Sequence, residues 1–403
     1  MHSVPHRIGI YLGVVQFLFT LTWTVYLIFL PQLAAQVGIK KDVVVFILMA
    51  DQLIFGLMDL AIGLWADRVA RTVGRLGIMV GSLTALSCFA FLLLAPIAAG
   101  GATLQSLFLG LTVVWLVTSS ALRAPPLMLL GKYVPKPSVP WLASLSLFGL
   151  GLSGAVAPYL TVALRQVDPR WPFALSSAAL LSATLGIVWA ERALANRAAK
   201  QTPAAAARPL SSSMIVFLIG IALLALGFQV HFSLNSAPQY LRFAKPADLE
   251  YLMPVFWIGF SLLMLPASWW TARFGGLVMM GAGGIIGAAC SLVAANAGSL
   301  VVLVSAQFFA GGAWGCALMS AVAAALAIGH TGREGAMTGG VFAILALATL
   351  ARIGAVATQL NSHSDIAAIL PSAPAAAWFL AGVLLLAVGI SRRRRGSATS
   401  ATH

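Results

Sequence analysis

The sequence predicts an all-α membrane protein with twelve transmembrane helices in two pseudo-symmetric six-helix bundles. Of its 403 residues, 60% are hydrophobic and only 8% are charged, whereas soluble domains carry about 25% charged residues. The apolar residues form long runs, and a helix of about 20 such residues spans a bilayer. The two halves also echo each other, since Ala66-Asp67-Arg68 ends the second run and Ala272-Arg273-Phe274-Gly275 ends the eighth.

The apolar runs define the expected elements. Those of the first half lie at roughly 9–31, 43–66, 76–97, 103–124, 139–164 and 172–191. Those of the second half lie at roughly 212–235, 249–271, 276–297, 299–328, 335–360 and 374–391. Barrel strands would instead appear as alternating segments of about ten residues. We therefore predict an N-terminal bundle over 1–191, a cytoplasmic linker over 192–211, a C-terminal bundle over 212–391 and a basic cytoplasmic tail over 392–403.

The net charge of +14 is distributed as in a polytopic membrane protein. Lys and Arg occur in short clusters between the apolar runs rather than in one extended patch, so we expect the lipid bilayer as a partner and no nucleic acid. They concentrate on the side that holds both ends of the chain. Because cytoplasmic loops of membrane proteins are enriched in Lys and Arg, this bias places both termini in the cytoplasm.

The sequence gives no sign of enzymatic chemistry. Its six histidines are scattered, its three cysteines fall inside apolar runs, and its Gly-rich pieces lack the Lys-Ser/Thr of a phosphate-binding loop. We therefore expect no enzyme, no cofactor and no metal site.

A hydrophilic turn follows the second run and carries one acidic and several basic residues. It reads Gly63-x-x-x-Asp67-Arg68, followed by Arg71 and Gly74-Arg75. This pattern resembles the loop motif after the second helix of the major facilitator superfamily, in its bacterial twelve-helix form. The resemblance implies alternating access in a bacterial inner (plasma) membrane, with helices 3, 6, 9 and 12 outside a central cavity. It also implies that Asp67 lies against the start of helix 11, near 332–335, and that Arg68 and Arg71 contribute to gating.

Strongly polar and aromatic side chains within the runs predict a cavity for an organic solute. They share helix faces in the helices that the resemblance places around the centre, since residues four apart lie on one face. The alternative for each is an interhelical bond or an interface anchor. The predicted cavity residues are Gln16, Thr20, Trp23, Gln229, His231, Asn235, Trp257, Gln307, Trp314 and Gln359.

Two carboxylates and one arginine lie deep in the runs, where charges are expensive and usually functional. Asp59 serves either a coupling role or a bond with a neighbouring helix. Asp51 and Arg352 each lie about 12 Å below the outer face at 1.5 Å per residue. We predict that these two form an ion pair when the protein is closed on that side. The alternative is that Arg352 binds an anionic solute directly and Asp51 accepts a local hydrogen bond.

Together these observations predict a secondary active transporter, a symporter of a small organic solute. We favour the proton (or another cation) as the coupling partner, because desolvation can bring the pKa of a membrane carboxylate into the working range. One alternative is a drug or metabolite exporter, or a uniporter, without carboxylate coupling. An alternative from another class is a membrane receptor or scaffold that transports nothing.

Overall fold

The structure is a computed structural model that describes residues 3–70, 72–196, 212–329 and 333–400. The described residues form helices and contain no strand. They include 12 helices that are long and apolar enough to cross a membrane. Most of the predicted linker lies outside the described residues; α8 ends at Ala195 and α9 begins at Ser212.

The first half contributes six of these spans. Its helices are α1 (Ser3–Gln36), α2 (Val44–Val69), α3 (Arg75–Ala99), α4 (Gln105–Ser119), α5 (Pro125–Tyr133), α6 (Val139–Ala163), α7 (Arg170–Thr184) and α8 (Ile187–Ala195). Short 3-10 segments are η1 (Lys41–Val43), η2 (Ala102–Leu104), η3 (Ser120–Leu122) and η4 (Lys136–Ser138). The fourth span runs from Ala102 to Tyr133 and joins α4, η3 and α5.

The second half contributes the other six. It contains α9 (Ser212–Phe228), the π-helix η5 (Gln229–Asn235), α10 (Ser236–Tyr240), η6 (Pro246–Asp248), α11 (Leu249–Leu252), α12 (Pro254–Phe274), α13 (Gly276–Ala295), α14 (Leu300–Gly329), α15 (Glu334–Ala357), η7 (Leu360–Ser362), α16 (Ser364–Ile369) and α17 (Ala373–Ser400). The last helix continues to Ser400, so the backbone of the predicted basic tail is helical as far as that residue.

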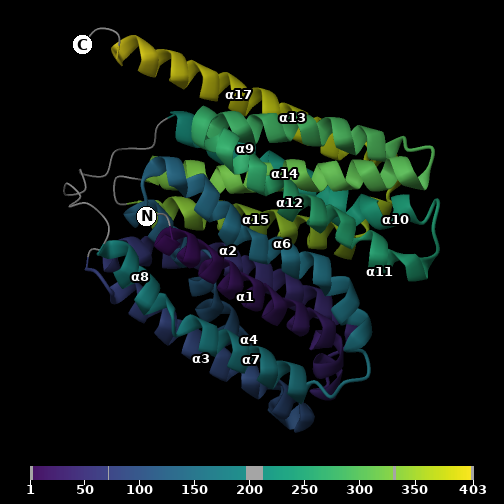
Figure 1. The fold of residues 1–403 in the computed structure, drawn as a ribbon. Helices are drawn as coiled ribbons and strands as arrows, with labels where there is room; N and C mark the ends of the chain where they lie inside the picture. The colour runs from purple at the N-terminus through teal and green to yellow at the C-terminus, as the bar shows by residue number, and fades with distance from the viewer. Residues whose placement is uncertain (1–2, 71, 197–211, 330–332, 401–403) are drawn as a thin grey trace.

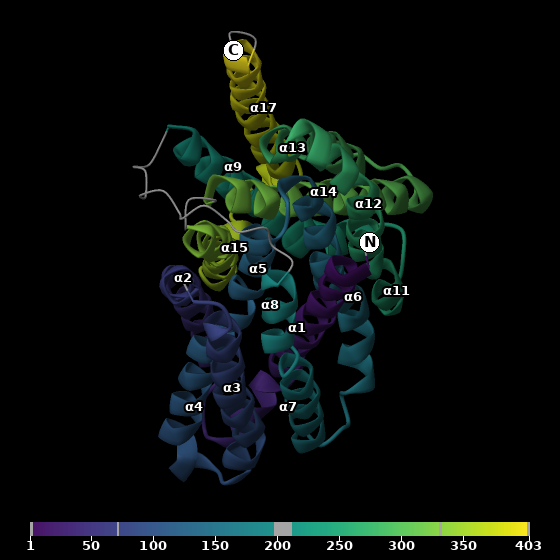
Figure 2. The same cartoon turned by 60° about the vertical axis from the view of Figure 1, so that its left-hand side comes forward.

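The two halves form two groups of helices whose axes are inclined to each other (Figures 1 and 2). In Figure 1, α3 and α7 lie along the lower edge, α13 and α17 lie along the upper edge, and α1, α6, α12, α14 and α15 lie between them. The most extensive contacts between the halves are those of α2 with α15 and of α6 with α12, and α5 also contacts α14 and α15. Both chain ends lie on the left of Figure 1, and we call that side of the molecule the terminal side.

A break in the fourth span has a clear cause. Pro125 and Pro126 lack the backbone N–H groups that would bond to carbonyls of the preceding turn, and their rings clash with that turn. Consequently α4 ends at Ser119, η3 follows, and α5 begins anew with Pro125 as its first residue. Arg123 lies within this break. The sequence expectation that the span ends at 124 is therefore wrong, because the apolar run resumes after the prolines.

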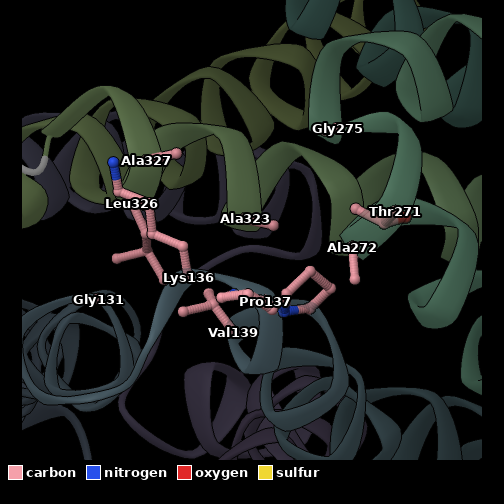
Figure 3. A pocket seen from close by; sticks show the side chains of 12 residues that line it. Gly131, Lys136, Pro137, Val139, Thr271, Ala272, Gly275, Ala323, Leu326 and Ala327 are labelled. Atoms are coloured by element: carbon pink, nitrogen blue, oxygen red, sulfur yellow. The ribbon is translucent and has the colours of Figure 1, made fainter.

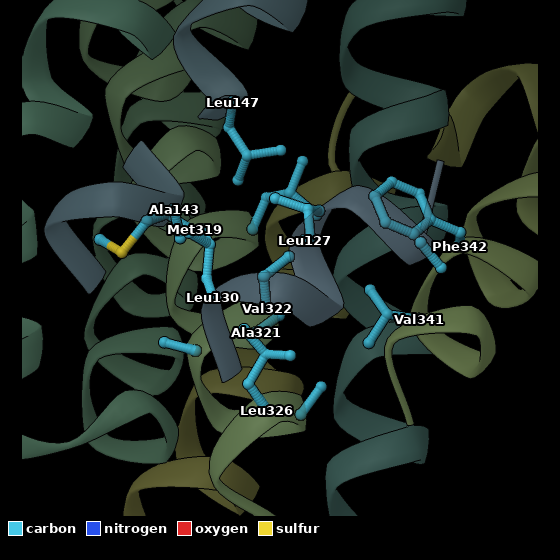
Figure 4. Close-up of a cluster of buried hydrophobic side chains, with 14 of the residues drawn as sticks. Leu127, Leu130, Ala143, Leu147, Met319, Ala321, Val322, Leu326, Val341 and Phe342 are labelled. Atoms are coloured by element: carbon cyan, nitrogen blue, oxygen red, sulfur yellow. The ribbon is translucent and has the colours of Figure 1, made fainter. Parts of the chain in front are cut away.

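An apolar cluster joins the halves on the terminal side. Leu127 and Leu130 of α5 lie against Val322 and Leu326 of α14 and against Val341 of α15, and all five are buried (Figure 4). Opening this side would bring these side chains into contact with water, at a cost of about 25 cal/mol for each Å² of apolar surface. The cluster therefore stabilises the closed arrangement of the terminal side.

Candidate functional site

A cavity of about 680 Å³ lies between the two halves. This volume is within the range of about 300–1,000 Å³ that is usual for small-molecule sites. Aromatic side chains make up a third of its lining, and residues of both halves contribute to the walls. The aromatic lining residues are Phe19, Trp23, Phe55, Phe228, Phe232, Trp257, Trp314 and Phe342. The polar lining residues are Gln16, Thr20, Gln52, Arg123, Gln229, Ser233, Thr349 and Arg352.

The cavity extends toward the side opposite the termini. Val45 at the start of α2 and Val356 at the end of α15 belong to its lining, and both helices have these ends on that side. Phe342, which belongs to the apolar cluster of the terminal side, lines the cavity at its other end. The cavity is thus closed toward the terminal side by packing between the halves.

Close backbone packing of α2 and α15 adds to this closure. A Cβ atom on Gly63 would collide with the carbonyl of Gly335, and one on Gly339 would collide with the carbonyl of Asp59. Only glycine permits this approach, because any side chain at these positions would push the two helices apart. These two glycines therefore allow α2 to pack closely against the first turns of α15.

Asp67 connects the same two helices by hydrogen bonds. Its Oδ1 accepts from the backbone N–H of Gly335 at 2.7 Å, and its Oδ2 accepts from that of Ala336 at 2.8 Å. These donors belong to the first turn of α15, where N–H groups lack partners within the helix and the helix dipole favours an anion. The contact that the loop motif implies is thus present. Arg68 is exposed, and Arg71 lies outside the described residues.

Replacing Asp67 by asparagine should weaken closure of the terminal side. The variant keeps the side-chain shape but loses the anion at the helix end, a contribution of about 0.3–2 kcal/mol. We expect a thiol placed in the cavity to react more slowly with an impermeant reagent added from the side opposite the termini. Equal reactivity in the variant and the parent would contradict a gating role for Asp67.

The corresponding segment of the second half, Ala272-Arg273-Phe274-Gly275, contains no Asp. Ala272 and Gly275, which belong to the echo of the motif, line a pocket of about 210 Å³ beside Lys136 and Pro137 at the start of the fifth span (Figure 3). This pocket shares no lining residue with the central cavity. The two halves are therefore similar in arrangement but differ in the chemistry of their terminal-side loops.

Asp59 and Arg123 form a buried ion pair beside the cavity. Arg123 Nη1 lies 2.8 Å from Asp59 Oδ2, and the two side chains are 16% and 0% exposed. The guanidinium carbon of Arg123 also lies 4.9 Å from the ring centre of Phe55 and 5.3 Å from that of Phe342. Phe55 belongs to the first half and Phe342 to the second, so Arg123 contacts both.

Sequence reasoning missed Arg123 because it took the first long apolar run as the whole span. The signal was present, since Leu127 to Leu130 continue the run immediately after the two prolines. Asp59 was weighed between a coupling role and a bond to a neighbouring helix. The structure gives it such a bond, to the fourth span, at the wall of the cavity.

Arg352 is held by a polar cluster on the second half. Its Nε donates to Oε1 of Gln229 at 2.9 Å, and Nε2 of Gln229 donates to the hydroxyl of Thr349 at 2.9 Å. Gln229 begins the π-helix, in which the extra residue per turn changes the direction of later side chains. Such segments are frequent at functional sites. Gln229 and Ser233 both line the cavity.

Asp51 lies away from the cavity, inside the first half. Its Oδ2 accepts a hydrogen bond of 2.9 Å from the hydroxyl of Tyr26, and both residues are buried. Tyr26 packs against Trp115, with ring centres 4.6 Å apart. The predicted pair of Asp51 with Arg352 is not formed in this structure. The pair was predicted for a state in which the side opposite the termini is closed. In this structure the cavity extends toward that side.

Removing the hydroxyl of Tyr26 should leave Asp51 without its donor. A buried acceptor that loses its partner costs about 1–3 kcal/mol, so we expect Tyr26→Phe to lower the stability measured by unfolding in detergent by that amount. Tyr240→Phe is the matched control, because Tyr240 is equally buried and its hydroxyl has no hydrogen-bond partner among the described residues. Equal stability of the two variants would contradict the importance of the Tyr26–Asp51 bond.

Six of the predicted cavity residues line the cavity: Gln16, Thr20, Trp23, Gln229, Trp257 and Trp314. The structure places the other four elsewhere. His231 Nε2 lies 3.0 Å from Oε1 of Gln307, and both are buried within the second half. Asn235 donates to the carbonyl of Leu370 at 2.8 Å. The seventh span thus has two polar faces, and the face of Gln229 is the one that borders the cavity.

Gln359 lies beyond the end of its helix. The helix α15 ends at Ala357, and Gln359 has a φ of 56°, a left-handed conformation that is common where helices end. The expectation that the eleventh span extends to 360 and carries Gln359 on its cavity face is therefore wrong. Sequence reasoning also missed Gln52, Phe55 and Thr349 as lining residues.

Comparisons with known proteins identify the fold. No protein-family profile matches the sequence, and no curated protein matches it. Among the described residues, no group of three or more His, Cys, Asp or Glu could hold a metal ion. Similar solved structures exist, and each matches nearly the whole chain at low sequence identity.

A bacterial homologue of the iron transporter ferroportin, in an outward-facing state, has a TM-score of 0.73 at 15% identity, covering 94% of this chain and 98% of its own. The human organic anion transporter MFSD10 (TETRAN) has a TM-score of 0.69 at 16% identity, covering 94% and 99%. FucP in the outward conformation has a TM-score of 0.67 at 15% identity, covering 97% and 99%. The fold that the loop motif predicted is therefore confirmed, and this chain has the twelve-helix fold of the major facilitator superfamily transporters.

Proposed function

We propose that this protein is a secondary transporter that moves a small organic solute across the membrane by alternating access. The observation that carries the proposal is the central cavity between two similar halves, which is closed on one side by packing between them. A solute in this cavity would have access to one side only. Rocking of the halves about the cavity would expose it to the other side.

We place the terminal side in the cytoplasm of a bacterial inner (plasma) membrane. The excess of Lys and Arg on that side supports this orientation. With the terminal side in the cytoplasm, the cavity extends toward the outside, and the structure corresponds to an outward-facing state. The similarity to ferroportin-homologue and FucP structures described as outward-facing is consistent with the assignment.

The coupling partner that we propose is the proton, and Asp59 is its acceptor. Asp59 forms an ion pair with Arg123, and Arg123 contacts aromatic rings of both halves. A proton on Asp59 would remove one charge of the pair and free the guanidinium to reorient, which would alter the contact between the halves. Two proteins of the same fold are described as a fucose:proton symporter and a proton:xylose symporter.

Counterflow in proteoliposomes tests this function. Vesicles preloaded with an unlabelled candidate solute should take up the labelled solute only when the protein is present. An inward-directed proton gradient should then drive net uptake of the solute. Counterflow that ignores the pH gradient would indicate a uniporter. The absence of counterflow with sugars, organic acids, amino acids and organic cations would favour a receptor or scaffold.

A further inference from the structure

The charges that line the central cavity are unbalanced. Arg123 and Arg352 are the charged residues of its lining in the described part of the chain, and no described carboxylate lines it. Asp59 lies directly behind the wall and pairs with Arg123. Within the described part of the chain, Arg352 is thus a cation without an ion-pair partner.

Arg352 is also incompletely hydrogen-bonded. A guanidinium has five N–H donors, and the one on Nε is bound by Gln229. Neither Nη atom has an acceptor among the described residues. Asp51, the carboxylate at the same predicted depth, accepts its hydrogen bond from Tyr26 instead. Because a cation within a membrane protein is costly when unpaired, this arrangement favours a negatively charged ligand.

Gln229 orients the guanidinium for such a ligand. Its amide binds Arg352 on one side and Thr349 on the other, so the Nε edge is occupied and the Nη edge remains available. That edge presents two parallel N–H donors, a geometry that matches the two oxygens of a carboxylate. A lysine would supply the same charge without this fork.

The walls next to the polar cluster suit a flat apolar body. Phe228 stacks on Trp314 with ring centres 4.7 Å apart, and Trp257 meets Phe228 edge to face at 5.9 Å. Across the cavity, Trp23 meets Phe55 edge to face at 5.2 Å. Aromatic side chains form favourable stacked and edge-to-face contacts with further rings.

We propose that the central cavity binds a small organic anion, with its carboxylate on Arg352 and its apolar body against Phe228, Trp257 and Trp314. This inference rests on the proposed function, because it assumes that the central cavity is the solute site. It adds the charge and shape of the solute. The solute is an amphipathic monocarboxylate, and neither a bare cation nor an uncharged sugar fits this description.

Three probes of the same shape and different charge test the proposal. They are 3-phenylpropanoate, 3-phenylpropanamide and 3-phenylpropylamine, and their binding to the purified full-length protein is measured by isothermal titration calorimetry. We expect the carboxylate to bind most tightly. Arg352→Gln should weaken carboxylate binding about 10-fold to 100-fold, the usual value of hydrogen bonds to a charged group, and leave amide binding unchanged. The carboxylate affinity of Arg352→Lys should lie between that of Arg352→Gln and that of the parent protein.

Arg170→Gln is the matched control. It removes one positive charge from the same side of the molecule, at an exposed position where Arg170 pairs with Asp168, and it should leave carboxylate binding unchanged. Equal or tighter binding of the amide or amine, or no binding by any probe, would overturn the proposal, as would equal loss in both variants. The selectivity of the parent protein gives this answer even if Arg352→Gln fails to fold.

The same probes separate the inference from the proposed function. Carboxylate binding that depends on Arg352, without counterflow of any solute, would refute transport and keep the anion site. Counterflow of sugars or organic cations, with no response to carboxylates, would refute the anion site and keep transport.

Discussion

Arg123→Gln is expected to destabilise the protein by about 3–5 kcal/mol, the usual cost of leaving one partner of a buried pair uncompensated. The partner left behind is Asp59, whose side chain is 0% exposed. Its Oδ1 already has no hydrogen-bond partner among the described residues. The carboxylate is fully buried, so little can replace the lost guanidinium.

The reciprocal variant, Asp59→Asn, should destabilise the protein less than Arg123→Gln does. In Asp59→Asn the remaining charge is Arg123, which is 16% exposed, borders the cavity and lies over Phe55 and Phe342. Cavity water and the two rings can compensate for part of the loss, the rings by about 0.5–2 kcal/mol. The ion pair therefore predicts an asymmetry between two variants that each remove one charge.

A double-mutant cycle on unfolding free energies in detergent checks this prediction. The double variant, with Asp59→Asn and Arg123→Gln, removes both charges and should be more stable than Arg123→Gln alone. Strictly additive losses would show that the two residues do not interact in the folded protein. Equal losses in the two single variants would contradict the difference in burial.

The twelve spans were predictable because a bilayer imposes one requirement on every crossing segment, and about 20 apolar residues satisfy it whatever the segment packs against. The contact of Asp67 was predictable for a related reason. Its motif is local, and the helix end that it contacts follows from the family arrangement. Gln16, Thr20 and Trp23 were correctly grouped because α1 is a regular helix there.

The failures have equally specific causes. The length of an apolar run shows where the run is interrupted, and the interruption at Pro125 lies inside the fourth span. For this reason Arg123 was not recognised as part of that span. Rise per residue gives the depth of Asp51 and Arg352 but not the direction in which each side chain points. The seventh span has two polar faces, and sequence periodicity does not identify the face next to the cavity. The end of α15 before Gln359 has no glycine or proline to mark it.

The largest conformational effect is expected from Gly63→Ala. The new methyl group would collide with the backbone of Gly335 in α15, and a backbone carbonyl does not move aside as a flexible side chain does. The helices α2 and α15 must then separate on the terminal side, while the cavity side is unaffected. Overpacking of this kind costs about 1–3 kcal/mol, which corresponds to a shift of about 5-fold to 150-fold in the balance between the two states.

Gly339→Ala should act in the same way, because its methyl group would meet the carbonyl of Asp59. Gly340→Ala is the matched control, since nothing lies within 4 Å of a Cβ at this position on the same helix. The measurement uses Ser233→Cys as a reporter in a background without the native cysteines, because Ser233 lines the cavity. An impermeant thiol reagent added from the side opposite the termini should label the reporter more slowly in the Gly63 and Gly339 variants and at the parental rate in the Gly340 variant. Unchanged labelling in all three would mean that the close approach of α2 and α15 does not hold the terminal side closed.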